Sequence, residues 1–394
     1  MTNKYKNNLC CGENTQWAGI KLILEDIIGY GMKKYFTFLL LSICLSSFYV
    51  THSGSREVLT AGQLHPFGRT LMADGRLELI GSASHFGYAF EGHSSLVSVE
   101  TGGDSTYPNY LQYEVDGVYG EKVRIPGGSK IVIPIRASGK GRHTVWIYKT
   151  TEAHTGPLFI WKIDGFGLEA LERPHAPLIE FIGNSITCGA LSDPSGVPCG
   201  KGVYQDQHNA YFAYGPRVAR TLKANFILSS VSGIGIYRNW NSDGPTMPAV
   251  YEKADFQAGG ARLWDFSLFT PDVVSIALGT NDYSNGDGVR VRTGFDSTAF
   301  VGHYVAFVRL VKSKYPAARI ALLSSPMVTG DKREQFQRCL MAVKKVIDSA
   351  FAGDKPVAVH FAVAMTPHGC SFHPSVEDHG VIAEELVPFF KTLL

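Results

Sequence analysis

The stretch LIEFIGNSITCG, residues 178–189, decides the fold of the C-terminal half of this chain. Residues 178–183 form an apolar run of strand length, and YFAYGPRVARTLKA (211–224) then repeats its apolar positions at helical spacing. A strand that is apolar along its length is typical of a parallel sheet buried on both faces. We therefore predict a parallel sheet with covering helices.

The alternation of strand and helix continues to the C-terminus. Further apolar strands are expected at 225–231, 272–279, 318–326 and 356–365, and further helices at 298–315, 334–351 and 376–394. This order predicts an α/β domain over residues 171–394, with helices on both faces of the sheet. Because ligands bind such sheets beyond the carboxyl ends of the strands, the functional residues are expected there.

Residues 56–170 have a different periodicity. Apolar and polar residues alternate in short segments at 77–90, 95–102, 110–117, 129–136 and 143–151, with breaks at Asp-Gly, Gly-Gly and Gly-Lys-Gly. β-branched and aromatic residues are frequent in these segments, as they are in antiparallel strands. The pattern predicts an all-β jelly-roll sandwich of about 100 residues.

The first 55 residues carry a candidate export signal. Two lysines precede an apolar segment, 36–50, of about 15 residues, which is signal-peptide length and short for a bilayer span. Met32 would then be the true start. The alternative interpretation of segment 36–50 is a buried core helix. The signal predicts a secreted or periplasmic protein without stable membrane insertion after its removal. A lipid anchor at Cys44, and with it a cell-surface location, is a weaker alternative because Ile43 is larger than the usual preceding residue.

Length and charge bound the function. The 394 residues are 45% hydrophobic and exceed one average domain, so two domains are expected. The net charge is only +2, with 18% charged residues, so no basic field marks a phosphate backbone. Nucleic acid is therefore not an expected partner.

The cysteines permit disulfides but do not indicate a metal site. Three of the seven fall in or before the signal, which leaves Cys188, Cys199, Cys339 and Cys370. Four cysteines in an exported chain allow two disulfides in three connectivities. Cys188 with Cys199 is the first choice, and four free buried thiols are the alternative. No CxxC pair or His-rich cluster suggests zinc, so no metal is expected.

Four short motifs follow the predicted strands. Ser185 stands between glycines at the exit of the first strand, where its hydroxyl can reach a substrate. Gly233 leaves a backbone N–H open to a ligand, and Asn281 has an amide that can donate to an oxyanion. His373, just before the last helix, is the expected base. Each motif alone also fits an ordinary turn, cap or surface residue, and their joint order favours a serine hydrolase.

These motifs resemble those of the SGNH hydrolases, which are named after their Ser, Gly, Asn and His. The likeness covers residues 177–394 and implies an α/β SGNH-hydrolase domain of the flavodoxin-like type. A jelly roll ahead of that domain, with MPAVYEK (247–253) and WDFSLFTPDVVSIALGTND (264–282), resembles the two-domain acetylesterases of carbohydrate esterase family 2.

The resemblance implies a role for each motif residue. Ser185 would be the nucleophile and His373 the base. The backbone N–H groups of Ser185 and Gly233 and the side chain of Asn281 would form the oxyanion hole. Hydrolysis would pass through an acetyl-serine intermediate, with no metal and no organic cofactor.

The chain departs from the family pattern at two places. Asn184 stands where an aspartate is usual, at a position that is not expected to transfer protons. Cys370 and Ser371 stand where an acidic residue normally precedes the histidine. A Ser–His dyad is therefore expected. The resembled family includes members in which a backbone carbonyl orients the histidine, and the sequence does not identify the group that orients His373. Glu377 and Asp378, which follow the histidine, are interpreted as solvated charges at a helix start.

Residues beside the motifs are candidates for contacts to sugar. Tyr237, Arg238 and Asn239 follow the glycine motif together with Trp240, and Phe372 precedes the histidine. Aromatic faces stack on sugar rings, and amide or guanidinium groups bond hydroxyls. Core packing is the alternative for each aromatic residue, and it is the preferred interpretation of Trp264.

Together these features predict an extracytoplasmic esterase that removes O-acetyl groups from polysaccharides or oligosaccharides of the xylan or mannan type. Acetylated carbohydrate is the expected partner. A lipase or thioesterase of the same superfamily is one alternative. A glycan-binding protein without catalysis is another, because the usual acid is missing.

Overall fold

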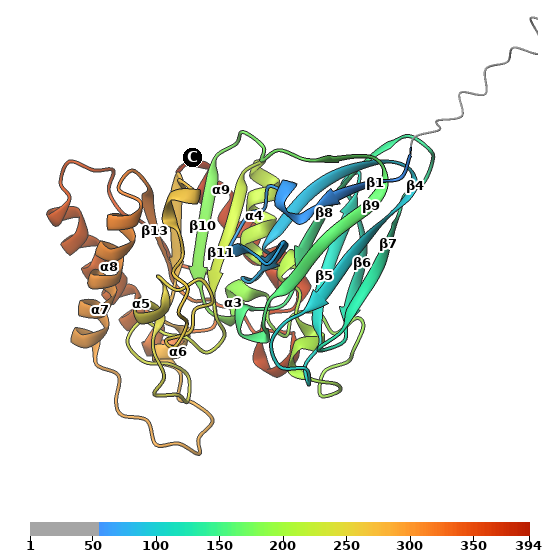
Figure 1. Ribbon diagram of the computed structural model, residues 1–394. Helices are drawn as coiled ribbons and strands as arrows, with labels where there is room; N and C mark the ends of the chain where they lie inside the picture. The colour runs from blue at the N-terminus through green and yellow to red at the C-terminus, as the bar shows by residue number, and fades with distance from the viewer. Residues whose placement is uncertain (1–54) are drawn as a thin grey trace, which may run out of the picture. The chain divides into compact units, whose positions relative to one another are not determined.

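The computed structural model describes residues 55–394, which contain two β-sheets (Figure 1). The expected signal segment and its three cysteines lie outside the described residues. Ser55–Leu394 form one compact unit by their internal contacts. Within this range, none of the helices combines the length and the apolar character needed to cross a bilayer.

The first sheet is antiparallel and has nine strands. Its hydrogen-bonded order is β2-β3-β9-β4-β8-β5-β6, with β1 paired to β9 and β7 paired to β4. The strands are β1 Glu57–Thr60, β2 Thr70–Ala73, β3 Arg76–Leu79, β4 His85–Thr101, β5 Asn109–Val115, β6 Val118–Ile125, β7 Lys130–Arg136, β8 Arg142–Lys149 and β9 Leu158–Ala170. The expected antiparallel β-domain is confirmed. Two short 3₁₀ turns, η1 Ala61–Gln63 and η2 Ala153–Thr155, lie between its strands.

Strand β4 differs from the prediction. The expected strands 77–90 and 95–102 are instead β3 and a 17-residue β4, which are separated by a turn that contains Ala83 at φ 52°. The first half of β4 pairs with β8 and the second half with β7. The pairing of β4 with β9 shifts in register near Gly92, whose φ is 93°. The break in alternation that suggested a strand end is therefore a bulge within one strand.

The second sheet is parallel, as predicted, and has five strands in the order β11-β10-β12-β13-β14. The strands are β10 Leu178–Gly183, β11 Asn225–Ser230, β12 Val273–Ala277, β13 Arg319–Leu323 and β14 Ala358–His360. The helices are α3 Ser185–Cys188, α4 Tyr214–Leu222, α5 Met247–Val250, α6 Thr280–Tyr283, α7 Ser297–Lys314, α8 Gly330–Ala350 and α9 Val376–Lys391. Four 3₁₀ turns complete this domain: η3 Tyr204–Gln207, η4 Ala210–Phe212, η5 Phe266–Leu268 and η6 Cys370–Phe372.

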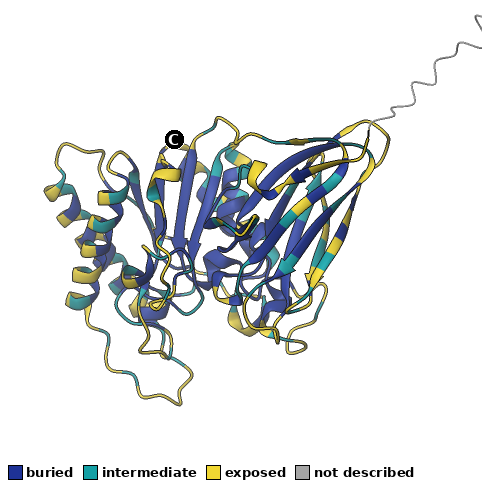
Figure 2. Cartoon of the chain, viewed as in Figure 1, coloured by how far each residue is buried: buried dark blue, intermediate teal, exposed yellow. Residues whose placement is uncertain are grey.

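Helices cover both faces of the parallel sheet. Phe181 of β10 belongs to a buried cluster with residues of α4 and α9, such as Phe390. Its neighbour Ile182 belongs to a second cluster with residues of α5, α7 and α8, such as Phe307 and Leu340. Figure 2 shows buried residues along both sheets and exposed residues on the outer sides of α7 and α8. The alternation of neighbours between two cores explains why these strands are mostly apolar on both faces.

Two elements of this domain are shorter than expected. The predicted helix 211–224 begins as the separate turn η4 before α4. The predicted strand 356–365 pairs only over β14, after which the Ala362 N–H donates to the Ser324 side chain instead of to a strand. The chain leaves the sheet there and runs toward His373.

The expected Cys188–Cys199 disulfide is wrong. Cys199 is bonded to Cys370, and Cys188 and Cys339 are free and buried, so four free thiols is also wrong. Cys188 ends α3, and its Sγ lies 3.2 Å from the Ser230 Oγ in the interior. The Cys188 thiol therefore points away from the loop that carries Cys199.

Candidate active site

The nucleophile turn, residues 183–189, joins β10 to α3. The Asn184 side chain caps α3 by accepting the Ile186 N–H at 3.1 Å. Gly183 is required, because a Cβ there would lie 2.0 Å from the Thr187 Oγ1. Gly189 ends the helix at φ 65°, where glycine is favoured. These local features place Ser185 at the first helical position, 9% exposed, beyond the carboxyl end of the strand.

His373 lies beside that serine. Its Nε2 is 3.0 Å from the Ser185 Oγ, and its Nδ1 is 2.9 Å from the Ser371 carbonyl oxygen. A carbonyl only accepts hydrogen bonds, so Nδ1 carries the proton and donates it. The lone pair of Nε2 therefore faces the serine hydroxyl. Partial burial of the ring lowers the pKa of His373 below 6.5, which favours this neutral form.

The histidine loop, residues 368–375, has an unusual backbone. Ser371 and Phe372 both adopt left-handed conformations, at φ 47° and 59°. The disulfide from Cys199 holds Cys370, whose N–H also donates to the Leu191 carbonyl at 2.9 Å. Non-glycine residues at positive φ need support from their surroundings. The contacts of Cys370 provide that support and aim the Ser371 carbonyl at His373.

Asp378 anchors the far end of the histidine loop, and its interpretation as a solvated charge is wrong. The side chain is buried, and its Oδ2 accepts the N–H groups of His368 and Ser375 at 2.7 and 2.9 Å. Its Oδ1 lies 2.8 Å from the His368 Nδ1. Asp378 therefore closes a capping box at the start of α9 and ties the loop to the helix. Glu377 is exposed, as expected, and accepts the Ser375 hydroxyl.

The glycine loop, residues 231–235, follows β11. Gly233 has φ 74°, and no atom lies within 4 Å of the position a Cβ would take, so the space beside it is open. The Gly233 carbonyl accepts the Trp240 N–H at 2.8 Å. The N–H of Ser185 has no acceptor within its own helix because it belongs to the first turn. The N–H groups of Ser185 and Gly233, which are expected in the oxyanion hole, therefore lie in segments whose backbone conformation is held by hydrogen bonds.

Asn281 lies at the second position of α6 and is buried. Its Nδ2 donates to the Ile234 carbonyl at 2.7 Å, which fixes the orientation of the amide. One amide hydrogen is engaged in this way, and the second remains for a ligand. The bond also joins α6 to the glycine loop.

Asp282, the next residue, was not singled out from the sequence. Its carboxylate accepts the N–H groups of Ile236, Tyr237 and Arg238 at 2.9 to 3.1 Å. Burial raises the pKa of this carboxyl to about 6, although the three N–H groups oppose the shift. Asp282 holds the chain that follows the glycine loop. Its place in the Gly-Thr-Asn-Asp motif was the signal that could have revealed it.

Three predicted sugar contacts have their polar groups engaged within the protein. The Arg238 Nε donates to the Asp282 carbonyl at 2.6 Å, and the Tyr237 hydroxyl accepts the Asp296 N–H at 3.2 Å. The Asn239 Oδ1 accepts the Gly235 N–H at 2.9 Å. These groups support the loop where they lie. A sugar contact by any of the three stays a prediction.

The aromatic candidates differ in exposure. Phe372 is 84% exposed and Trp240 is 46% exposed, so both rings are available to a ligand. Trp264 is buried and stacks on Phe269, which confirms its interpretation as a core residue. Phe372 lies next to His373 and is the best placed of the predicted sugar contacts.

Comparisons with known proteins agree with this geometry. The model of the GDSL-like lipase/acylhydrolase family matches residues 181–377, and the carbohydrate esterase 2 N-terminal model matches residues 67–174. The cellulase/esterase CelE of Acetivibrio thermocellus is 31% identical over 322 residues, which is 79% of this chain and 37% of CelE. The chain thus spans just over a third of that relative.

Two further relatives match over most of their length. An acetylxylan esterase / glucomannan deacetylase of Cellvibrio japonicus is 27% identical over 314 residues, 77% of this chain and 82% of the relative. The structure of a family two carbohydrate esterase from Clostridium thermocellum in complex with cellohexaose has a TM-score of 0.72 at 27% identity, and the match covers 85% of this chain and 98% of that chain. The chain therefore belongs to the GDSL-like lipase/acylhydrolase family, and its first domain matches the N-terminal domain of carbohydrate esterase family 2.

Proposed function

We propose that this chain is a secreted esterase that removes O-acetyl groups from polysaccharides or oligosaccharides of the xylan or mannan type. Two relatives from Cellvibrio japonicus are acetylxylan esterases / glucomannan deacetylases, which supports the acetyl group and the xylan and glucomannan substrates. The observation that carries the proposal is the 3.0 Å contact between the Ser185 Oγ and the unprotonated Nε2 of His373. A serine held against a neutral imidazole can attack an ester.

Acylation begins when the Ser185 Oγ attacks the acetyl carbonyl carbon and His373 Nε2 takes the hydroxyl proton. The carbonyl oxygen becomes an oxyanion, which accepts hydrogen bonds from the N–H groups of Ser185 and Gly233 and from the Asn281 amide. One such donor typically stabilises the transition state by about 3 kcal/mol. The bond to the sugar oxygen then breaks, and His373 returns the proton to that oxygen. The products of this half-reaction are the free sugar hydroxyl and acetyl-Ser185.

Deacylation repeats the same steps with water. His373 takes a proton from the water as the water oxygen attacks the acetyl carbonyl, and the same three donors receive the oxyanion. Collapse of the intermediate releases acetate, and His373 returns the proton to Ser185. The imidazolium that forms twice in this cycle has the Ser371 carbonyl as its partner in place of a carboxylate. A carbonyl can fix the tautomer and stabilise the imidazolium, although it carries no net charge.

The proposal is tested by the release of acetate from acetylated xylan and acetylated glucomannan by the purified protein. Wild-type protein should release acetate, and Ser185→Ala should not, although it should still bind the polysaccharide. Robust turnover by Ser185→Ala would refute the serine mechanism. Binding to polysaccharide without acetate release by the wild type would instead identify a glycan-binding protein.

Acyl-chain length separates this proposal from the lipase or thioesterase alternative. Acetyl esters should be hydrolysed much faster than octanoyl esters of the same alcohol. The opposite order would favour the alternative.

A further inference from the structure

The β-sandwich contributes a buried carboxylate to the candidate active site. Glu152 lies in the connection between β8 and β9, and its Oε2 accepts the Ser232 N–H at 2.7 Å. Ser232 directly precedes Gly233 in the glycine loop. A residue of the N-terminal domain therefore holds the backbone next to a proposed oxyanion-hole donor.

Glu152 is ionised although it is only 4% exposed. Burial alone would raise its pKa, but the nearby His208 and the Ser232 N–H outweigh burial and lower the pKa to about 2. The His208 Nε2 lies 3.6 Å from the Glu152 Oε1, and the Cys188 Sγ lies 3.8 Å from the Glu152 Oε2. A charged acceptor makes a stronger hydrogen bond to an N–H than a neutral one does.

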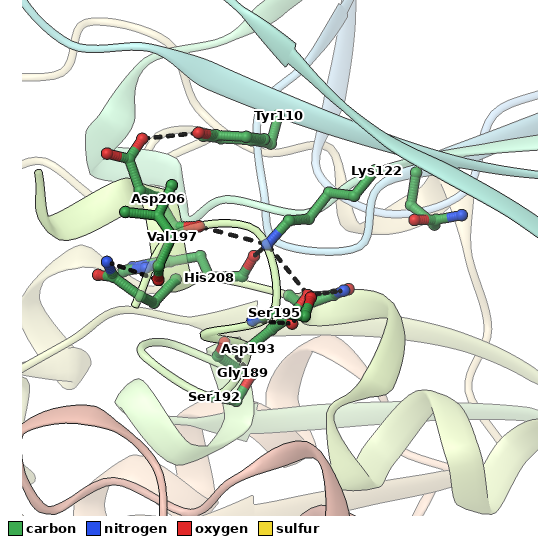
Figure 3. Close-up of polar contacts among 12 residues, drawn as sticks. Tyr110, Lys122, Gly189, Ser192, Asp193, Ser195, Val197, Asp206 and His208 are labelled. Carbon is green, nitrogen blue, oxygen red and sulfur yellow. Dashed lines mark hydrogen bonds and ion pairs between the residues drawn. The ribbon is translucent and has the colours of Figure 1, made fainter. Parts of the chain in front are cut away.

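The surroundings of Glu152 are themselves fixed from the sandwich. The buried Lys149 ammonium donates to the carbonyl oxygens of Thr151 and Glu152 at 2.9 and 2.7 Å. On the other side, Lys122 of β6 lies 3.0 Å from the Asp193 carboxylate and donates to the His208 carbonyl at 3.4 Å (Figure 3). The backbone carbonyls of Glu152 and His208 are thus each bound by a lysine of the first domain.

The glycine loop needs such an anchor. Gly233 has no side chain, and its positive φ leaves the preceding peptide free to turn. Two backbone hydrogen bonds oppose that freedom: the Trp240 N–H donates to the Gly233 carbonyl, and the Ser232 N–H donates to the Glu152 carboxylate. The Tyr204 hydroxyl also donates to the Ser232 side chain at 2.8 Å. The peptide that bears the Gly233 N–H lies between the two backbone hydrogen bonds. Loss of either contact lets that N–H turn away from the oxyanion.

We propose that Glu152 is a positioning residue of the reaction, which acts through the Ser232 N–H to aim the Gly233 N–H at the oxyanion. This inference rests on the proposed function of Gly233 and gives the sandwich domain a part in catalysis. It assigns Glu152 no contact with the substrate and no proton transfer.

Two variants test it, with kcat and KM measured on an acetylated substrate. Glu152→Ala removes the acceptor and should lower kcat by about 100-fold, close to the loss of one oxyanion donor. Glu152→Gln keeps a neutral acceptor of nearly the same shape and should lower kcat by about tenfold. The KM should stay within about twofold in both, because the hydrogen bond to the oxyanion strengthens in the transition state.

Glu78→Gln is the matched control. Glu78 is also 4% exposed and also reaches from the sandwich to the second domain, where it accepts from Arg262 at 2.7 Å. Its contact lies outside the nucleophile turn, the glycine loop and the histidine loop, so kcat should stay near the wild-type value. Thermal melting of all variants separates loss of stability from loss of rate.

The outcomes distinguish this inference from the proposed function. Wild-type kcat in both Glu152 variants, with Ser185→Ala inactive, would overturn the inference and leave the esterase mechanism standing. An equal fall of kcat in Glu78→Gln would also overturn it, because the loss of any contact between the two domains would then lower kcat. Activity in Ser185→Ala would overturn the proposed function and the inference together.

Discussion

The nucleophile turn and the histidine loop meet at one hydrogen bond, but they are held in different ways. Ser185 is positioned by its neighbours in sequence: the cap at Asn184 and the glycines at 183 and 189. His373 is positioned by partners far away in sequence, since Cys370 is bonded to Cys199 at a separation of 171 residues. One half of the proposed dyad is thus a local structure and the other a tertiary one.

This difference predicts how each half fails. A change within the nucleophile turn should disturb that turn directly, because its contacts are short in sequence. The histidine loop should fail when a remote contact is cut, even if its own sequence is intact. Its left-handed residues make it dependent on those contacts, because such conformations cost energy of order 1 kcal/mol each.

The largest effect comes from removing either end of the shared hydrogen bond. Ser185→Ala and His373→Ala should each lower kcat by about 10⁴-fold or more, and the double variant should be no worse than the worse single variant, since the two act as a unit. Acetate release by the three proteins measures this. Additive losses would mean that the two groups act independently, and the nucleophile turn and the histidine loop would then not be two halves of one dyad.

Gly183→Ala tests the local contacts that hold the nucleophile turn. A Cβ at this position would lie 2.0 Å from the Thr187 Oγ1, so α3 must shift. We expect a loss of about 2 kcal/mol in the free energy of unfolding and about 100-fold in kcat, because small displacements of a nucleophile are costly. Denaturant unfolding and acetate release measure the two effects.

Gly302→Ala is the control for that variant. Gly302 lies in α7, and no atom lies within 4 Å of its Cβ position. Alanine there should raise stability by up to about 1 kcal/mol and leave kcat unchanged. If Gly183→Ala behaves like Gly302→Ala, the nucleophile turn has more freedom than its contacts indicate.

Removal of the Cys199–Cys370 disulfide tests the tertiary contacts that hold the histidine loop. Cys199→Ser with Cys370→Ser should lower kcat by about tenfold, because the Ser371 carbonyl is then less firmly aimed at His373. A reductant should lower the wild-type kcat by the same factor and have no effect on the double variant, and both can be followed in one assay. Wild-type activity in the double variant would mean that the Leu191 and Asp378 contacts suffice to hold the histidine loop.

The same division explains what could be predicted from the sequence. The parallel strands were predictable because their residues pack alternately into two cores, as Phe181 and Ile182 do, so that both faces are mostly apolar. The antiparallel strands were predictable as elements, but the expected strand end at residue 90 lies beside a bulge within β4, because bulges and turns use similar residues. The motif that holds Ser185 was readable because its geometry is local.

What could not be predicted depends on chain segments that meet only in the fold. The partner of Cys199 was wrongly assigned because short sequence separation does not imply proximity of two thiols. Asp378 was interpreted as a surface charge, although it binds two N–H groups of the histidine loop. Glu152 has no signal in its local sequence, since its partner Ser232 belongs to another domain. Contacts of this kind require the tertiary structure.

The pH dependence of the rate gives the smallest and most specific effect. Partial burial lowers the pKa of His373, and only its neutral form can take the serine proton. The rate should therefore be constant at neutral pH and fall as the pH drops through a pKa below 6.5, so that the active range extends further into acid than it would for a fully exposed histidine. Profiles of kcat/KM measured on a neutral acetyl ester report this pKa in the free enzyme.

Removal of the disulfide should shift the acid limb toward 6.5, because a loosened loop exposes the ring, whereas Gly302→Ala should leave the limb in place. An acid limb already at or above 6.5 in the wild type would mean that His373 is held by a charged partner rather than by the Ser371 carbonyl, and the contrast between the two halves of the dyad would be lost.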